Sequence, residues 1–247
     1  MQALQPFSLV IPVLNEGDTI TSLAHEIAGM RQEQDSFEVI FVDDHSRDRT
    51  PEILNDLIDQ FPWIRTVRLS RQSGQSAALW HGISAARFPL IATMDGDGQN
   101  DPADIRHMID VYQHVSAENS CCLVNGRRTS RQDTGWRKFS SRLANSIRSR
   151  LLKDDTPDSG CGIKIFSRET FLALPAFTHM HRFIPALIHQ RGGEVVSVPV
   201  NHRARKSGKS HYGTLDRLFA GIIDLLGVLW LGKRAIRWDL AGEKRNG

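Results

Sequence analysis

The chain has 247 residues, of which 40% are apolar and 24% are charged, and this length corresponds to one large domain or two small ones. The composition excludes a collagen, a disulfide scaffold and a largely disordered chain. The three cysteines, two of them adjacent, favour a reducing compartment. The net charge of +3 conceals a net +8 in residues 127–153 and a net +6 in residues 201–247. Regions this basic bind an anionic partner or lie solvated.

No segment has the pattern of a signal peptide or of a membrane span. The first apolar run, Phe7–Leu14, has no basic start and is broken by Pro12. A span needs about 20 apolar residues. The nearest candidate, Leu218–Leu231, has 14 residues and includes Asp224. We therefore expect no transmembrane helix.

Strand-like and helix-like patterns alternate through the first half of the chain. The predicted strands are Phe7–Val13, Phe37–Val42, Ile64–Leu69, Leu90–Met94 and Cys121–Val124. The predicted helices are Ile20–Met30, Thr50–Ile58, Gln75–Ala86 and one that Asp101 caps. Further along, the pattern predicts a basic helix, two short strands and a last helix: Trp136–Leu152, Ile163–Phe166, Val195–Val200 and Leu215–Leu231. This alternation predicts an α/β fold with a mainly parallel sheet.

Polar residues follow three of the predicted strands. They are Asn15-Glu16-Gly17, Asp43–Asp48 and Asp95-Gly96-Asp97-Gly98-Gln99. In an open α/β sheet, ligands bind beyond the carboxyl ends of the strands. Carboxylates that converge there repel one another unless a cation lies among them. Asp95 and Asp97 suit Mg²⁺ or Mn²⁺, since Mg²⁺ takes one or two carboxylates together with substrate phosphates. The alternative is a polar turn before a helix.

Two further loops contain candidate ligand-binding residues. Asp44 could accept hydrogen bonds from a ribose or a base, or it could belong to a capped turn. Gly74, at a predicted helix start, would let the backbone approach a ligand. The segment Ser70–Gln75 has neither the Walker A pattern nor G-x-G-x-x-G, so an NAD enzyme is not indicated. The histidines show no zinc-binding spacing.

Taken together, these motifs resemble those of family 2 glycosyltransferases. Phe7–Glu16 resembles the opening of that family, and Asp43–Thr50 resembles its second-strand motif. Met94–Pro102 is similar to the D-x-D-x-Q motif of its polyprenyl-phosphate branch, the dolichol-phosphate mannose synthase-like enzymes. The resemblance continues through Asp158–Gly162, His181–Phe183 and Arg205–Tyr212 and covers residues 7–215. Gln72, Gln75 and His211 depart from residues common in the family, which bears on the donor more than on the fold.

The resemblance implies a GT-A, Rossmann-like fold and an inverting enzyme. Its donor would be a UDP- or GDP-sugar (mannose or glucose-like), its acceptor a dolichyl or undecaprenyl phosphate, and its cofactor Mg²⁺ or Mn²⁺. The implied nucleotide-sugar contacts are Pro12, Glu16, Asp44 and Asp95, with Gly74 beside them. The implied metal ligands are Asp97 and Gln99, with Asp95 close by. The implied acceptor-phosphate residues are Arg127, Arg137, Ser140, Arg205 and Ser210.

The chemistry of such a transfer sets which residues it needs. An ionised phosphate is already a nucleophile, so no strong general base is required. Catalysis would consist of positioning and of stabilising the leaving diphosphate with the metal and Arg205. Asp158 is the best candidate if a base exists, and its alternative is a turn before Gly160. Arginine forks match phosphate oxygens, which gives the basic region a purpose.

The last predicted helix is amphipathic and ends in basic residues. Its apolar residues recur at steps of three and four, and Lys233, Arg234 and Arg237 follow. This pattern is typical of an interfacial helix, and a core helix is the alternative. We expect a glycosyltransferase domain over 1–213 and an interfacial helix with a basic tail over 214–247. The protein would then bind the cytoplasmic face of the membrane peripherally.

Other functions are compatible with parts of the sequence. A family 2 transferase that acts on a saccharide hydroxyl would need a committed base. A sugar nucleotidyltransferase usually has a basic Gly-rich loop, where this chain has the acidic Asn15–Asp18. A non-enzymatic membrane-binding module would leave Asp95 and Asp97 unused. Nucleic acid is not expected, since no fold signature for it is present. A second copy of the chain or an integral membrane protein is left open as a partner.

Overall fold

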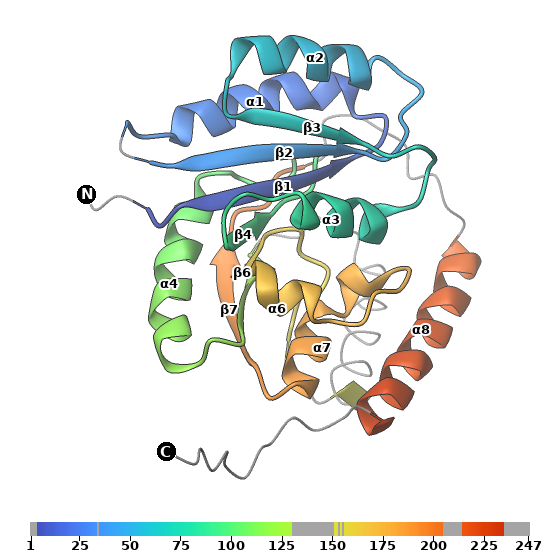
Figure 1. Ribbon diagram of the computed structural model, residues 1–247. Coiled ribbons are helices and arrows are strands. Elements are labelled where there is room, and N and C mark those ends of the chain that lie inside the picture. The colour runs from blue at the N-terminus through green and yellow to red at the C-terminus, as the bar shows by residue number, and fades with distance from the viewer. Residues whose placement is uncertain are drawn as a thin grey trace, which may run out of the picture.

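The computed structural model describes residues 4–33, 35–129, 151–152, 154, 156–204 and 214–234, with only the backbone for 214–220. Seven strands form one sheet in the order β3-β2-β1-β4-β6-β5-β7 (Figure 1). The strands are β1 (Phe7–Val13), β2 (Phe37–Asp43), β3 (Ile64–Arg68), β4 (Leu90–Thr93), β5 (Cys122–Arg128), β6 (Lys164–Ser167) and β7 (Glu194–Val200). Among these described strands, β6 alone runs antiparallel to its neighbours, β4 and β5. The predicted α/β fold with a mainly parallel sheet is confirmed.

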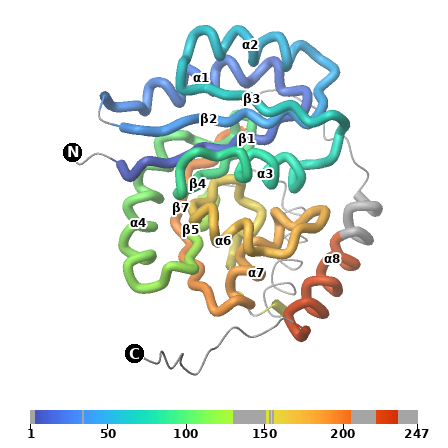
Figure 2. Tube along the Cα trace, viewed as in Figure 1, coloured from blue at the N-terminus to red at the C-terminus, as the bar shows by residue number. Residues whose placement is uncertain are grey.

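Helices cover both faces of this sheet. One face packs against α1 (Gly17–Met30), α2 (Thr50–Gln60) and α4 (Asp104–Glu118). The other packs against α3 (Gln75–Ser84), α6 (Arg168–Leu172), the 3₁₀ helix η1 (Met180–Arg182), α7 (Ile184–Gln190) and α8 (Thr214–Arg234). Figure 2 traces α8 along the outside of the molecule, and α8 packs against α7.

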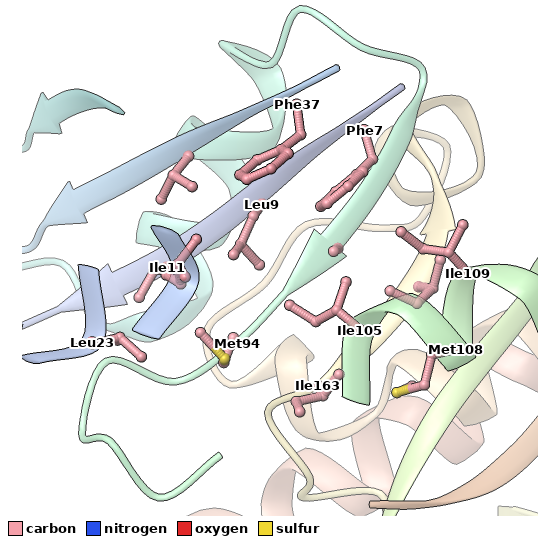
Figure 3. Close-up of a cluster of buried hydrophobic side chains, with 14 of the residues drawn as sticks. Phe7, Leu9, Ile11, Leu23, Phe37, Met94, Ile105, Met108, Ile109 and Ile163 are labelled. Carbon is pink, nitrogen blue, oxygen red and sulfur yellow. The ribbon is translucent and has the colours of Figure 1, made fainter. Parts of the chain in front are cut away.

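The strand residues divide between two apolar cores by simple alternation. In β1, Leu9 and Ile11 lie in the core under α1, α2 and α4, whereas Val10 lies in the core on the opposite face (Figure 3). In β2, Phe41 and Val42 divide in the same way. Successive side chains of a strand point to opposite faces. Strands buried on both faces therefore appear in the sequence as continuous apolar runs.

Several predicted boundaries are wrong by a few residues. The fifth strand continues to Arg128 rather than ending at Val124, because polar Asn125 and the residues after it still pair with β7. The helix expected to follow Asp101 begins at Asp104, since Asp101 Oδ1 accepts the backbone N–H of Ala103 in a turn before it. The basic helix predicted over 136–152 lies outside the described residues, apart from 151 and 152.

Close packing of α3 on the sheet depends on a glycine. A Cβ added to Gly82 would lie 2.5 Å from Val10 Cγ1 and 2.6 Å from Val42 Cγ2. We predict that Gly82→Ala lowers the free energy of unfolding by about 1–3 kcal/mol, because overpacking displaces core side chains. Urea unfolding measures this change.

Gly29 in α1 is the matched control, since nothing lies within 4 Å of an added Cβ there. Gly29→Ala should be neutral or stabilising by up to about 1 kcal/mol, because alanine is the better helix former. A Gly82→Ala protein as stable as wild type would show that α3 does not pack this closely.

Candidate active site

The loops that follow β1 and β2 are joined to each other by hydrogen bonds. The backbone N–H of Asn15 donates to Ser46 Oγ (2.9 Å), and Asn15 Oδ1 accepts from the N–H of Arg47 (2.8 Å). The N–H of Glu16 donates to Thr50 Oγ1 (3.0 Å). Asn15 has a φ of 54°, in the left-handed region that asparagine tolerates better than most residues. Glu16, expected at the nucleotide, is therefore held at the start of α1.

The carboxylate of Asp44 holds the loop that precedes α3. Its two oxygens accept the backbone N–H groups of Ser73 (2.6 Å) and Gly74 (2.8 Å), and its side chain is buried. Gly74 has a φ of +89°, which a residue with a side chain rarely adopts. The structure thus brings together Asp44 and Gly74, which the sequence placed after different strands. Pro12, the third expected nucleotide contact nearby, lies opposite Val42 of β2.

Asp95 lies just beyond the end of β4, in a space that a glycine provides. Any side chain at Gly162 would collide with the Asp95 carboxylate. Oδ1 of Asp95 accepts from Gln75 Nε2 (2.8 Å) on the first turn of α3. Burial and, after it, the negative charge of Asp97 raise the pKa of Asp95 to about 6 against the opposing charges of Lys164 and Arg128. This carboxyl group is costly to ionise in the absence of a cation.

The donor atoms around Asp95 fit a divalent cation that also binds phosphate. Asp97 lies close enough to raise the pKa of Asp95, and Gln99 N–H donates to Asp97 Oδ1 (3.1 Å). The residues described here contain no group of three or more His, Cys, Asp or Glu that could hold a metal by themselves. A Mg²⁺ ion usually takes one or two carboxylates and completes its shell with water and substrate phosphates. Asp95 and Asp97 match that requirement.

Asp158 is engaged by an arginine on the strand that faces it. Arg128 Nε donates to Asp158 Oδ2 (2.7 Å) and its Nη2 donates to Oδ1 (2.6 Å), a two-point ion pair. The backbone N–H of Arg128 also donates to Oδ2 (3.1 Å). An arginine bound at both oxygens stabilises the ionised carboxylate, which weakens it as a proton acceptor. The geometry favours Asp158 as the residue that orients Arg128, and its role as a base stays a hypothesis.

One buried cationic group in the site, Lys164, was missed in the sequence. Lys164 is 4% exposed at the start of β6, and its Nζ donates to the carbonyls of Ser159 (3.1 Å) and Cys161. Burial lowers the pKa of Lys164, while the negative charge of Asp95 raises it. A lysine between Ile163 and Ile165 in an apolar run was the available signal.

His181 is held against the N-terminus of α3. Its Nδ1 lies 2.8 Å from Ser76 Oγ, which also accepts the His181 backbone N–H (3.3 Å). Burial, together with the positive charges of Arg182 and Lys164, lowers the pKa of His181 to about 3. The imidazole is therefore neutral at physiological pH.

The predicted acceptor-phosphate residues are only partly described. Arg127 is exposed, while its neighbour Arg128 points to the opposite face of β5 and reaches Asp158. The other four predicted residues, Arg137, Ser140, Arg205 and Ser210, lie outside the described residues. Arg128 was missed because the predicted strand stopped at Val124, so the alternation of faces was not carried to the strand end.

The raised pKa of Asp95 predicts how a neutral substitution affects stability. Because the folded pKa is above the unfolded value of 3.8, the folded state binds this proton more tightly. That stabilisation is complete below about pH 4 and is lost as the pH rises through about 6. In EDTA at pH 7.5, Asp95→Asn should therefore raise the free energy of unfolding by about 1–3 kcal/mol. Urea unfolding across pH 4–8 tests this.

The gain from Asp95→Asn should vanish at the acidic end of that range. Asp56→Asn on the exposed side of α2 is the control and should show no such pH-dependent gain. If Asp95→Asn were less stable than wild type at pH 7.5, ionised Asp95 would not destabilise the folded protein as we predict.

Two curated relatives are similar to nearly the whole chain. The dodecaprenyl-phosphate galacturonate synthase of Rhizobium johnstonii is 36% identical over 237 residues, covering 93% of this chain and 68% of the relative. The undecaprenyl-phosphate 4-deoxy-4-formamido-L-arabinose transferase of Edwardsiella ictaluri is 32% identical over 231 residues, covering 92% of this chain and 69% of the relative. This chain thus spans about two thirds of the length of each relative.

Solved structures share the fold at low sequence identity. The mannosyl-3-phosphoglycerate synthase of Rubrobacter xylanophilus superposes with a TM-score of 0.66 at 15% identity, covering 96% of this chain and 78% of that one. The glucosyl-3-phosphoglycerate synthase of Mycobacterium tuberculosis superposes with a TM-score of 0.65 at 19% identity, covering 94% of this chain and 81% of that one. The expected GT-A fold is confirmed. Residues 8–174 match the family described as Glycosyl transferase family 2, and the chain belongs to that family.

Proposed function

We propose that this protein transfers a sugar from a nucleoside diphosphate sugar to a polyprenyl phosphate, with inversion at the anomeric carbon. One observation carries the proposal: Asp95, two residues from Asp97, lies within electrostatic reach of the half-buried Arg128 and the buried Lys164. Such a site suits two anionic substrates, one bound through a cation and the other through basic side chains. The names of both curated relatives give a polyprenyl phosphate as the sugar acceptor.

On the donor side, the residues divide between the nucleotide and the diphosphate. Glu16, Asp44, Gly74 and Pro12 line the ends of β1 and β2, where the nucleotide would lie. Asp97, Gln99 and Asp95 would hold Mg²⁺ or Mn²⁺, and the M. tuberculosis synthase was solved with Mn²⁺ and UDP-glucose. When bound, the cation would supply positive charge to the diphosphate leaving group.

On the acceptor side, the chain would hold a phosphate in line with the sugar. Arg128, oriented by Asp158, would donate hydrogen bonds to the phosphate oxygens, and Lys164 would add a second positive charge. Arg127, Arg137, Ser140, Arg205 and Ser210 are proposed to complete this subsite. A phosphate oxygen would attack the anomeric carbon while the bond from that carbon to the diphosphate oxygen breaks. The electron pair leaves with the nucleoside diphosphate, so no proton has to be removed.

The sugar and the nucleotide base are not assigned. The expectation of mannose or glucose has no support from the two named relatives, which transfer galacturonate and a formamido-arabinose. Sugars of this range differ by a carboxylate, an amide or a hydroxyl, and a few polar contacts discriminate among them. A panel of UDP- and GDP-sugars is therefore the appropriate substrate set.

We predict that the purified protein moves label from one of these donors into solvent-extractable lipid when polyprenyl phosphate and Mn²⁺ or Mg²⁺ are present. EDTA should abolish the transfer. Asp97→Asn should reduce it by at least about 100-fold, because the charge on the leaving group is no longer balanced. Asp56→Asn should behave as wild type.

Two outcomes of this assay would contradict parts of the proposal. A protein that binds UDP or GDP with metal but labels no lipid would contradict the lipid acceptor and favour a saccharide hydroxyl. Transfer at the full rate in EDTA would contradict the metal assignment.

The outer side of α8 is apolar and exposed. Four large apolar side chains on this side are about half exposed or more: Ile222 (46%), Ile223 (68%), Leu226 (61%) and Trp230 (62%). Successive members of this set are one, three and four residues apart. The other side packs on the body of the protein through Val228, which is 1% exposed. Across the described ranges, no helix has both the length and the apolar character to cross a bilayer.

We propose that this apolar stripe of α8 binds an anionic membrane surface. Lys233 and Arg234, which lie in its last turn, would contact lipid headgroups. The inner side of the helix is anchored by His179 Nδ1, 2.9 Å from Asp224 Oδ2, and by Gln190 Nε2, 3.3 Å from the Val228 carbonyl. Helix α8 would then dock as part of the folded body and bring the site to the lipid acceptor.

We predict that the double variant Ile223→Glu, Leu226→Glu loses most of its binding to vesicles that contain anionic lipid, because two charges replace apolar contacts. Wild-type binding should weaken as salt is added. Sedimentation with vesicles measures both effects.

A matched control adds the same charge elsewhere: Gln113→Glu with Ala117→Glu on the exposed side of α4. It should sediment like wild type. If the control lost as much binding, the added negative charge alone would explain the loss. If the α8 variant bound vesicles like wild type, the apolar stripe of α8 would not be the membrane-binding surface.

A further inference from the structure

A short segment after β7 lies along the loop that contains Asp97 and Gln99. The backbone N–H of Arg203 donates to the Gln99 carbonyl (2.8 Å), and Gln99 Nε2 donates back to the Arg203 carbonyl (3.3 Å). Asn100 and His202 form an antiparallel bridge between the same two segments. Residues about 100 positions apart in the chain are thereby paired at the proposed metal site.

The guanidinium of Arg203 joins this pairing to two further elements. Its Nη1 lies 2.5 Å from Glu26 Oε2 on α1, and its Nη2 lies 2.9 Å from Asp101 Oδ2, just after Gln99. Asn201 adds two bonds to Asp104, at 2.7 and 3.1 Å. Without the Arg203 guanidinium, the carboxylates of Glu26 and Asp101 would repel each other at the base of the loop.

The pairing determines which atom of Gln99 can act as a ligand. The amide nitrogen is occupied by the Arg203 carbonyl, so the amide oxygen Oε1 is the end left for a cation. Amide oxygens are ligands of Mg²⁺ and Mn²⁺, whereas the NH₂ group is not. A rotated Gln99 would present a donor to the metal and remove a ligand.

We propose that Arg203 is a positioning residue for the metal-binding loop. It holds Gln99 with its amide oxygen free to face a cation. This inference rests on the proposed metal role of Asp97 and Gln99. Arg203 would act through its bonds to Gln99, Glu26 and Asp101 rather than by binding a substrate.

A purely structural role would have a different signature. The side chains of Arg203, Glu26 and Asp101 are 37%, 33% and 23% exposed, and ion pairs this accessible contribute little to folding stability. Displacement of a binding group by about 1 Å, by contrast, can cost about 100-fold in rate. Loss of Arg203 should therefore affect metal binding far more than unfolding.

The test measures how tightly the Arg203→Gln variant binds Mn²⁺ in the presence of UDP or GDP. The electron paramagnetic resonance signal of free Mn²⁺ reports the unbound fraction. We expect the Mn²⁺ dissociation constant to rise about 10-fold or more, with the metal-free thermal midpoint changed little. Glu26→Gln should give a smaller rise, because Asp101 still holds the guanidinium. Arg203→Lys should be intermediate, because one ammonium replaces the fork that spans two carboxylates.

Arg65→Gln is the matched control. Arg65 lies 2.6 Å from Glu38 and is 32% exposed, and both residues lie near the amino ends of β3 and β2, away from the site. This variant should lose at least as much stability and bind Mn²⁺ as wild type does.

The inference is overturned if Arg203→Gln binds Mn²⁺ like wild type, if Arg65→Gln weakens binding equally, or if wild type binds no Mn²⁺ with either nucleotide. Should Arg203→Gln fail to fold, Glu26→Gln and Arg203→Lys decide by the same readout, and wild-type Mn²⁺ binding in both overturns the inference. Because Mn²⁺ binding requires no acceptor, wild-type Mn²⁺ binding without any lipid labelling would overturn the proposed acceptor alone.

Discussion

The register of β1 against its two neighbours places the acidic loops together. Val13 of β1 lies opposite Asp43 of β2, and Val10 lies opposite Thr93 of β4, all in parallel pairing. The loops after the three strands therefore leave the sheet at the same edge. A slip of one residue would exchange the faces of every side chain, and both faces of these strands are packed. The two cores thus hold the register on which the site depends.

Within that frame, the site concentrates charge where the interior would otherwise be apolar. Asp95 is difficult to ionise, Lys164 is buried beside backbone carbonyls, and Arg128 is tied to Asp158. Folded proteins retain such groups mainly where function needs them, since apolar residues would pack there at less cost. A cation near Asp95 would lower the cost of ionising that carboxylate, whereas the charge of Arg128 is already balanced by Asp158.

Much of the fold and part of the site could be predicted because the relevant signals are local. Apolar runs and helical periodicity depend on neighbouring residues, so five strands in the first half were placed within a few residues. The motif from Asp95 to Gln99 was found because it directly follows a strand. Arg128 was not found from the sequence, because its neighbour Arg127 is equally basic. Only the full length of β5 shows which of the two faces Asp158.

By itself, the sequence determined the α/β architecture, the edge of the sheet that carries the site and the resemblance to family 2 glycosyltransferases. Only the tertiary structure decided which partners meet there: Gln75 with Asp95, Arg128 with Asp158, and Gln99 with Arg203. The physical reason is distance along the chain. These pairs are 20 to 104 residues apart, and their contacts arise from strand order and register, which no local pattern encodes.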